Sequence, residues 1–380
     1  MITLGSRCLT GVFLGAGLAI LTAGPADSQT GAGVARFMRT TDPSFDVYTT
    51  NPGLPTQEWL QRHFWKMLVY SPYFDSRLSW YPNGFVYIDA YAIYTGSALA
   101  LEHPDWILTD AGGNKLYIPW GCSKGACPQY AADISNPTFR EYWISRAAQT
   151  LAKGYKGLFV DDVNMNFTVS DGSGNFVSPI DRTTGSAMTW DAWRSYMATF
   201  AEQIRSAFQG TEIVHNSVWF AGPPGVRDQD PYIQRQIAAA NFQFIEFGVN
   251  DGGLTGGTGI WSLDSLLGYI DRVHAANIGV ILSGVATDPA GREYALANYF
   301  LISTGNDGLG NTAQTPGNWW AGFEVDLGAP AGNRTGWNNL WRRDFSGGMV
   351  LVNPPQGANV TVTLPGTYKR LDGTPLTSIT

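Results

Sequence analysis

The chain has 380 residues, of which 44% are hydrophobic and only 14% are charged. That length suffices for one large core with a small second module. The formal net charge is −7 and no run of Lys or Arg occurs, which argues against nucleic acid as a partner. The chain also has 14 Trp, 17 Tyr and 19 Phe, and we expect most of these rings to fill the core.

The N-terminus has the pattern of an export signal. Arg7 is its only positively charged side chain, and an apolar stretch follows from Cys8 to Ala23. Small residues at Gly24 and Ala26 offer a cleavage site after Ala26. We therefore predict a signal peptide over residues 1–26 and a secreted or periplasmic protein. The apolar stretch is short and Gly-rich for a spanning helix, so an uncleaved membrane anchor is the less favoured alternative.

Strands and helices alternate through most of the chain after this leader. In chain order, the predicted strands cover residues 36–40, 84–91, 130–134, 157–161, 212–217, 242–247 and 278–283. The predicted helices between and after them cover residues 57–68, 136–153, 190–208, 232–240, 263–276 and 291–302. Seven or eight such units predict parallel strands covered by helices, as in a (β/α)8 TIM barrel, over residues 35–336. A doubly wound sheet is the alternative, but no Gly-rich phosphate loop follows the first strand.

The tail of the chain has a different pattern. Helical periodicity disappears from Trp337 onward, and residues 349–354 and 360–364 have the composition of antiparallel strands. We predict a small antiparallel β module over residues 337–380 that packs on the barrel. Support of the barrel is its expected role, with sugar binding as the alternative.

Two cysteines remain after signal cleavage, Cys122 and Cys127, in a Gly-rich loop. In an oxidising compartment they are expected to form a local disulfide. A zinc site is the alternative, but no His is near them in sequence and two thiolates do not complete a tetrahedral site. We predict the disulfide, no metal site and no cofactor.

Polar side chains end four of the predicted strands. They are Asp89, Asp161 with Asp162, His215 with Asn216, and Glu246. In a barrel these ends face one pole, where active sites gather. A ring of carboxylates in an aromatic-rich, exported barrel suggests glycoside hydrolysis, which needs two carboxyl groups on opposite sides of the scissile bond. The Gly-x-Ser-x-Gly elbow of Ser hydrolases and the His-Glu-x-x-His spacing of zinc proteases are both absent.

Asp161 and Glu246 are the predicted catalytic pair. Adjacent strand residues face opposite sides, so Asp161 and Asp162 should not both point into the barrel. This alternation relaxes at a strand end, and the choice between the two stays open; we favour Asp161 as the reacting carboxylate and Asp162 as its support. Glu246 ends an apolar strand, and burial there would raise its pKa, as a general acid requires.

Other polar and aromatic residues are candidates for substrate binding. Asp89, Asp162, His215 and Asn216 would position the sugar. Asp89 as a loop anchor and His215 as a packed ring are the alternatives. Exposed aromatic rings can stack on sugar faces, and the candidates at loops or strand ends are Trp80, Trp106, Trp120, Trp219 and Trp261.

Three stretches of the chain have distinctive motifs: Ile-Ser-Asn-Pro at 134–137 before a helix with Tyr142-Trp143, Lys-Gly-Tyr-Lys-Gly-Leu-Phe-Val-Asp-Asp-Val at 153–163, and Arg343-Asp344-Phe345 with Val-Leu-Val-Asn-Pro at 350–354. These motifs resemble those of hypothetical glycosyl hydrolase family 15. The resemblance covers roughly residues 35–380 and extends, more distantly, to endo-α-1,4-polygalactosaminidase barrels. It implies a TIM barrel with the catalytic carboxylate at Asp161, and an acid/base on a later strand, which Glu246 fits.

The sequence thus predicts a secreted glycoside hydrolase that cleaves O-glycosidic bonds of a polysaccharide (EC 3.2.1.-). We expect a monomer without a nucleic-acid partner and without a membrane contact after signal cleavage, and we prefer a retaining mechanism. A non-catalytic carbohydrate-binding barrel is the alternative, and a scaffold protein is a third. Geometry separates them, because only hydrolysis needs Asp161 and Glu246 to face one another.

Overall fold

The computed structural model describes residues 2–5, 31–40, 53–123, 126–246, 249, 254–284, 286, 288–311 and 315–380. The main sheet is a closed barrel of eight strands, which confirms the predicted (β/α)8 fold. The barrel strands follow one another in chain order: β2 (Phe37–Arg39), β3 (Lys66–Val69), β4 (Gly84–Asp89), β7 (Gly157–Asp161), β10 (Glu212–Asn216), β11 (Phe242–Ile245), β12 (Gly279–Ser283) and β13 (Gly308–Asn311). Helices occupy the connections: α2 (Leu54–His63), α3 (Ala98–Glu102), α4 (Pro137–Leu151), α5 (Trp190–Ala207), α6 (Pro231–Ala238), α7 (Leu263–Ala275) and α8 (Pro289–Ile302).

Two of the eight barrel strands were not expected from the sequence. The predicted helix over residues 57–68 ends at His63, and residues 66–69 form β3 instead. Strand β13 was not predicted at all. The predicted strand over residues 130–134 is shifted to β6 (Gln129–Ala131), which pairs antiparallel with β5 (Ala92–Tyr94) outside the barrel. The barrel lacks the predicted strand over residues 130–134 but includes β3 before β7. Strand β7, which ends in Asp161, is therefore still the fourth barrel strand.

The chain divides into two compact units. One comprises Met1–Met67, Phe247–Asp271 and Gly279–Thr380, and the other comprises Leu68–Glu246 and Arg272–Ile278. This division cuts the barrel strands into two groups. It does not coincide with the boundary at residue 337 that the sequence predicts between barrel and β module.

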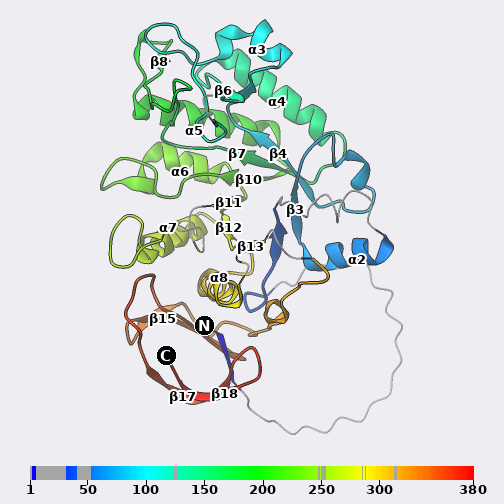
Figure 1. Cartoon of the computed structure of the whole chain (residues 1–380), viewed down its shortest axis with the longest axis vertical. Helices are drawn as coiled ribbons and strands as arrows, with labels where there is room; N and C mark the ends of the chain where they lie inside the picture. The colour runs from blue at the N-terminus through cyan, green and yellow to red at the C-terminus, as the bar shows by residue number, and fades with distance from the viewer. Residues whose placement is uncertain are drawn as a thin grey trace. The chain divides into compact units, whose positions relative to one another are not determined.

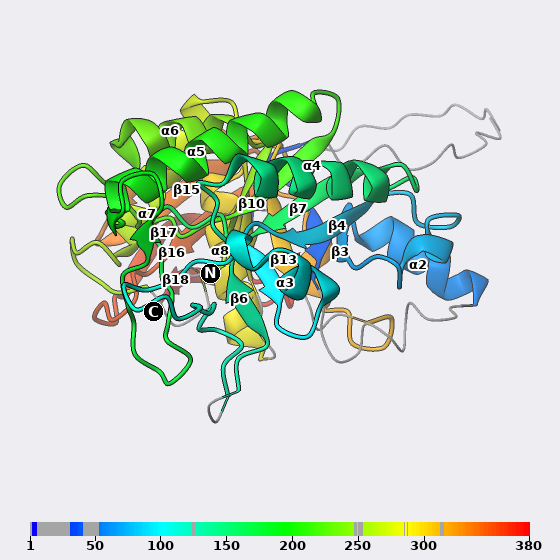
Figure 2. The ribbon, with the colours of Figure 1, turned by 90° about the horizontal axis from the view of Figure 1, so that it is seen from above.

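The unit of Leu68–Glu246 holds strands β4, β7, β10 and β11. Neighbouring strands pair in parallel, with Asp89 opposite Asp161 and Val160 opposite His215. Helices α4, α5 and α6 lie along one side of these strands (Figures 1 and 2). A side-chain N-cap begins each of these helices: Asn136 accepts from Thr138 N, Thr189 from Ala192 N, and Asp230 from Tyr232 N and Ile233 N.

The C-terminal part of the other unit is an antiparallel sheet, as predicted. Its strands are β14 (Thr335–Trp337), β15 (Leu340–Phe345), β16 (Gly348–Val352), β17 (Val362–Lys369) and β18 (Pro375–Ile379). Buried side chains from these strands form a core of their own, with Leu340, Met349, Leu351, Val362, Leu364 and Ile379. Helix α8 contacts β15 and β16 in the same unit.

A short strand from the predicted leader joins this sheet. Strand β1 (Ile2–Gly5) pairs antiparallel with β16 and with β17, and so lies between them. Residues 6–30, which hold most of the predicted signal peptide and its cleavage site, lie outside the described residues. Among the residues that the structure describes, no helix combines the length and the apolar character that a membrane span needs.

Candidate active site

The polar ends of β4, β7, β10 and β11 meet in one unit of the molecule. The parallel register places Asp89 beside Asp161 and Asn216 beside Phe244, two residues before Glu246. Because the carboxyl ends of parallel strands share one edge, carboxylates from three strands and the amide from β10 come together here. The contacts that these polar side chains make lie between residues 68 and 246.

Three donors hold the carboxylate of Asp161 at the end of β7. The Tyr87 hydroxyl donates to Oδ2 over 2.6 Å, and Asn216 Nδ2 donates to Oδ1 over 2.7 Å. The backbone N–H of Asp162 also donates to Oδ1, over 3.0 Å. With both oxygens engaged, the carboxylate has one fixed orientation, which a nucleophile requires.

The amide of Asn216 connects Asp161 with Glu246. The same Nδ2 atom donates to Asp161 Oδ1 over 2.7 Å and to Glu246 Oε2 over 2.8 Å. Two acceptors on one nitrogen cannot be farther apart than about 5.5 Å at these lengths. One oxygen of each of the two predicted catalytic carboxylates therefore lies within that distance of the other.

Glu246 is the residue directly after β11, and its side chain is exposed. The structure therefore does not bury the Glu246 side chain as the sequence led us to expect, because the strand ends one residue earlier. Exposure leaves the carboxyl group accessible from solvent.

Asp162 departs from regular strand geometry. Its φ of 54° lies in the left-handed region, which is uncommon for residues other than Gly. The side chain is partly buried, and its Oδ1 accepts from Trp120 Nε1 over 3.2 Å and from Asn164 Nδ2 over 2.9 Å. Burial, together with the charge of Asp161, raises the pKa of Asp162 to about 7. The carboxyl group of Asp162 thus changes its charge near neutral pH.

Asp89 lies at the end of β4 between these acids and the next loop. Burial raises its pKa well above the usual range, and the charges of Asp162 and Asp161 act in the same direction. Its Oδ1 accepts the backbone N–H of Tyr91 over 2.8 Å, as the loop-anchor alternative expects. Asp89 thus anchors its loop and lies near Asp161 and Asp162, while its role in sugar binding stays a prediction.

Tyr87 is a site residue that the sequence reasoning missed. Its ring stacks on Phe159 with 6.3 Å between centroids and lies 5.0 Å from the ring of the exposed Tyr70. Burial raises the pKa of its hydroxyl, so Tyr87 remains a hydrogen-bond donor to Asp161. The signal was available, because Tyr87 precedes Asp89 by two residues and so shares its face of the strand.

His215 is separated from the carboxylates. It is fully buried, and its Nδ1 lies 2.9 Å from Gln236 Nε2 on helix α6. Gln236 also donates to Gln243 Oε1 over 3.1 Å. Burial lowers the pKa of His215 to about 3, so the ring is neutral. This placement matches the packed-ring alternative and not the predicted role in sugar binding.

The candidate tryptophans differ in exposure. Trp120 is 58% exposed, and its indole N–H contacts Asp162. Trp219 and Trp106 are buried, and Trp106 donates to Thr138 Oγ1. Trp80 is partly buried against Phe74 and Tyr81, and Trp261 is exposed in the other unit. Burial makes Trp219 and Trp106 poor sugar platforms, and Trp120 is the candidate that adjoins a site carboxylate.

The predicted disulfide between Cys122 and Cys127 is present in the loop that carries Trp120. Among the described residues, no three His, Cys, Asp or Glu side chains are grouped as metal ligands. The site is thus built from carboxylates, one amide and aromatic side chains.

Comparison with solved structures finds chains of low sequence identity to this one. The hydrolase domain of PelA from Pseudomonas aeruginosa is 15% identical, with 74% of this chain and 95% of that chain covered and a TM-score of 0.44. The α-galactosidase TtGalA from Thermus thermophilus is 13% identical, with 84% and 66% covered and a TM-score of 0.46. The GH36 α-galactosidase AgaA from Geobacillus stearothermophilus is 12% identical, with 83% and 46% covered and a TM-score of 0.45.

No curated protein sequence matches the chain. The family model described as "Hypothetical glycosyl hydrolase family 15" matches residues 65–243. That stretch contains Asp89, Asp161, Asp162 and Asn216 and ends before Glu246. The match confirms the resemblance that the sequence motifs indicate over these residues, and it supports a glycoside hydrolase.

Proposed function

We propose that the chain is a secreted, retaining glycoside hydrolase that cleaves O-glycosidic bonds of a polysaccharide. One observation carries the proposal: the Asn216 amide donates to both Asp161 and Glu246, so their oxygens lie within about 5.5 Å. Retaining enzymes have carboxyl groups about 5–5.5 Å apart, whereas inverting enzymes need about 6.5–9.5 Å to admit a water.

Each carboxylate has a role in this mechanism. Asp161, held by Tyr87 and Asn216, attacks the anomeric carbon and forms a glycosyl ester as the bond to the leaving oxygen breaks. Glu246 gives its proton to that oxygen. Glu246 then takes a proton from a water molecule, whose oxygen attacks the anomeric carbon and releases Asp161. Asp89 and Asp162 would contact sugar hydroxyls.

Two features support export of the enzyme. The leader over residues 1–26 has the pattern of a signal peptide, and the Cys122–Cys127 disulfide suits an oxidising compartment. An exported enzyme meets its substrate outside the cytoplasm, so the proposed polysaccharide lies there as well. We propose a monomer that works without a cofactor.

The test begins with the exported protein and a panel of polysaccharides, with products identified by mass and the first-formed anomer by NMR. Retention of configuration is expected. Asp161→Asn and Glu246→Gln should each lower kcat by about a thousandfold or more, because each removes a reacting group. Glu141→Gln, at an exposed carboxylate on helix α4 of the same unit, is the matched control and should keep full activity.

Chemical rescue distinguishes the two roles. Azide should restore turnover of a substrate with an activated leaving group in Glu246→Ala, and yield a glycosyl azide of retained configuration. Full activity of either carboxylate variant would refute the assignment. Binding of a glycan by the wild type without cleavage would favour the carbohydrate-binding alternative.

A further inference from the structure

Two loops of the site unit are joined into one platform. The first comprises the described residues of 105–132, which follow β4, and the second comprises residues 168–187, which follow β7. Tyr117 and Ser170 exchange two backbone hydrogen bonds of 2.9 Å, and Ile180 N donates to Thr109 O over 2.8 Å. These bonds make a continuous backbone connection between the loops, which we call the loop platform.

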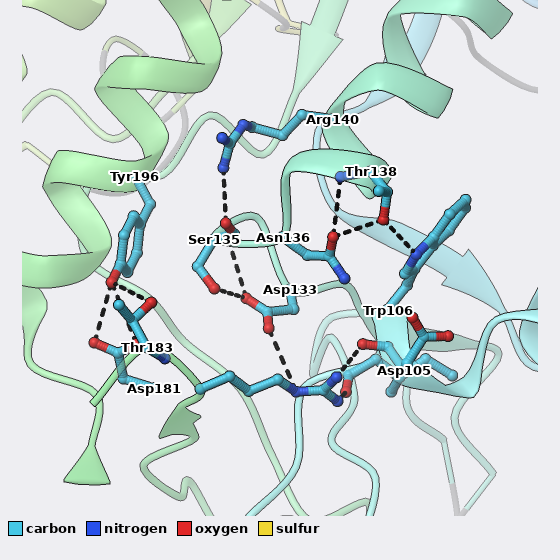
Figure 3. A network of polar contacts seen from close by, with 12 residues as sticks. Asp105, Trp106, Asp133, Ser135, Asn136, Thr138, Arg140, Asp181, Thr183 and Tyr196 are labelled. Carbon is cyan, nitrogen blue, oxygen red and sulfur yellow. Dashed lines mark hydrogen bonds and ion pairs between the residues drawn. The ribbon is translucent and has the colours of Figure 1, made fainter. Parts of the chain in front are cut away.

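Arg182 fastens the outer end of the loop platform. Its guanidinium donates to the carbonyl oxygens of Asp105 and, over 2.7 Å, of Ile107. Its Nε lies 3.5 Å from Oδ2 of Asp133, which is buried. Figure 3 shows this polar network, in which side chains of the loop platform meet those near the start of helix α4. One side chain thus links both loops with the segment before α4.

The carboxylate of Asp133 depends on this arginine. Ser135 donates to Oδ1 through its N–H over 3.0 Å and through its hydroxyl over 2.5 Å. Oδ2 makes no hydrogen bond and has the Arg182 guanidinium as its counter-charge. Burial raises the pKa of Asp133, and the nearby Arg182 acts against that shift. Loss of the guanidinium would leave the buried Oδ2 of Asp133 without a counter-charge, which costs free energy. This cost favours the one position of the loop platform in which the ion pair forms.

The inner end of the loop platform meets the active site at Trp120. The indole N–H is hydrogen-bonded to Asp162, while more than half of the side chain is exposed. An exposed ring that is fixed at one edge by a polar contact presents a rigid apolar surface at little entropic cost. A sugar ring next to the one that reacts is the occupant of matching size and chemistry.

We infer that Arg182 is a positioning residue that holds Trp120 beside Asp162 as a second sugar subsite, so that the enzyme prefers extended glycans. The inference rests on the proposed function. Arg182 touches no reacting group, and its effect passes through the loop platform to Trp120. The preference for long glycans over short ones depends on Arg182, whereas the rate of bond cleavage does not.

The first arm of the test measures kcat/KM for a long and a short oligosaccharide of the glycan that the enzyme cleaves. Trp120→Ala and Arg182→Ala should lower the ratio of kcat/KM for the long oligosaccharide to kcat/KM for the short one by roughly 2- to 10-fold, the range of one aromatic contact. Arg182→Lys keeps the charge beside Asp133 but cannot donate to both carbonyls in the same fork, so it should recover the melting temperature but not the ratio.

Matched controls come from the same unit. Arg235 has the same exposed fraction as Arg182, 36%, and forms an ion pair with Glu202 away from the platform. Trp190 is about as exposed as Trp120, at 53% and 58%. Arg235→Ala and Trp190→Ala should leave the ratio of long to short unchanged.

The second arm does not need activity. With 5-fluorotryptophan incorporated, the Trp120 resonance is assigned by its loss in Trp120→Phe. It should shift or broaden in Arg182→Ala and stay in place in Arg235→Ala. If the Trp120 resonance is unchanged in Arg182→Ala, the positioning role of Arg182 is overturned. If the resonance moves but the ratio of kcat/KM for long and short oligosaccharides is unchanged, the sugar subsite is overturned. If no glycan is cleaved, the proposed function fails and the subsite fails with it, while the resonance still decides what Arg182 holds.

Discussion

At the scale of single residues, the pair Asp161 and Asp162 shows how one backbone angle reshapes a site. Regular alternation would send the two side chains to opposite faces of the sheet. The φ of 54° at Asp162 breaks that alternation, at a typical cost of about 1–3 kcal/mol. Both carboxylates then lie close enough to Asp89 for their charges to raise its pKa. The period-two rule therefore could not settle the pair from sequence.

The raised pKa of Asp162 predicts a stability that depends on pH. The folded-state pKa of about 7 lies above the ordinary value of 3.8, so the folded protein binds the extra proton between these values. The contribution of Asp162 to the free energy of unfolding is fully present below pH 4 and is lost as the pH rises through 7. Asp162→Asn removes this loss, and the variant should be more stable than wild type at pH 8 by about 2 to 4 kcal/mol, after allowance for partial exposure.

Urea unfolding at pH 5 and pH 8 measures this difference. Asp110→Asn serves as the control, because that carboxylate is exposed and its pKa is lowered by Asn114 rather than raised. A gap between Asp162→Asn and wild type that does not grow with pH would show that Asp162 is ionised throughout the range.

The residues of the site were predictable to different degrees. Asp161, Asn216 and Glu246 could be named because each follows an apolar strand, and strand ends converge in a barrel. Tyr87 was missed because a Tyr inside a strand has the composition of a core residue. His215 was proposed alongside Asn216 although adjacent strand residues face apart, and the structure places it against Gln236.

At the scale of elements, the sequence did not reveal two barrel strands, β3 and β13, and each has its own local reason. Strand β3 has four residues, Lys66–Val69, directly after a helix, and its apolar spacing also fits one more helical turn. Strand β13 has two glycines in four residues, Gly308–Asn311, which hides its strand character. Pairing with the neighbouring strands forms both, and that information is not local.

Helix α8 offers a prediction at this scale, because one arginine satisfies its C-terminus. Arg343 on β15 donates from Nη1 to the carbonyl oxygens of Phe300 and Ser303 over 2.8 Å and of Leu301 over 3.4 Å. Arg343 is buried, so these carbonyls would lose a charged donor without gaining water. Arg343→Met should lower the free energy of unfolding by about 2 to 4 kcal/mol.

Arg342 is the matched control for this substitution. It lies next to Arg343 on the same strand, and it pairs with Asp344, which is 45% exposed. Arg342→Met should cost less than about 1 kcal/mol, as surface pairs usually do. Equal costs for the two variants in urea unfolding would rule out the capping role.

At the scale of the whole molecule, the alternation of elements sufficed to predict the barrel and the antiparallel tail. The division into two units could not be predicted, because the break at residues 67 and 68 falls inside β3. Nor could the pairing of residues 2–5 with the tail, since about 340 residues separate the partners in sequence. Contacts of that range depend on the completed fold, which no local pattern encodes.

Removal of the leader gives the last prediction. Strand β1 lies between β16 and β17, so cleavage after Ala26 takes away the hydrogen-bonding partner of both. Their side chains still share the buried core of the β module, including Met349 and Val362, and the sheet should stay folded. We expect the exported form to be less stable than the full chain by about 2 to 4 kcal/mol, the net value of a few backbone hydrogen bonds.

Amide hydrogen exchange compares the two forms directly. Amides of β16 and β17 should exchange faster in the exported form, while those of β14 and β15 serve as an internal reference because they pair with one another in both forms. Identical exchange in β16 and β17 would mean that β1 adds nothing to the sheet. The proposed catalytic carboxylates belong to the other unit, so activity per folded molecule should be the same for both forms. A loss of activity on cleavage would instead show that the leader strand supports the site.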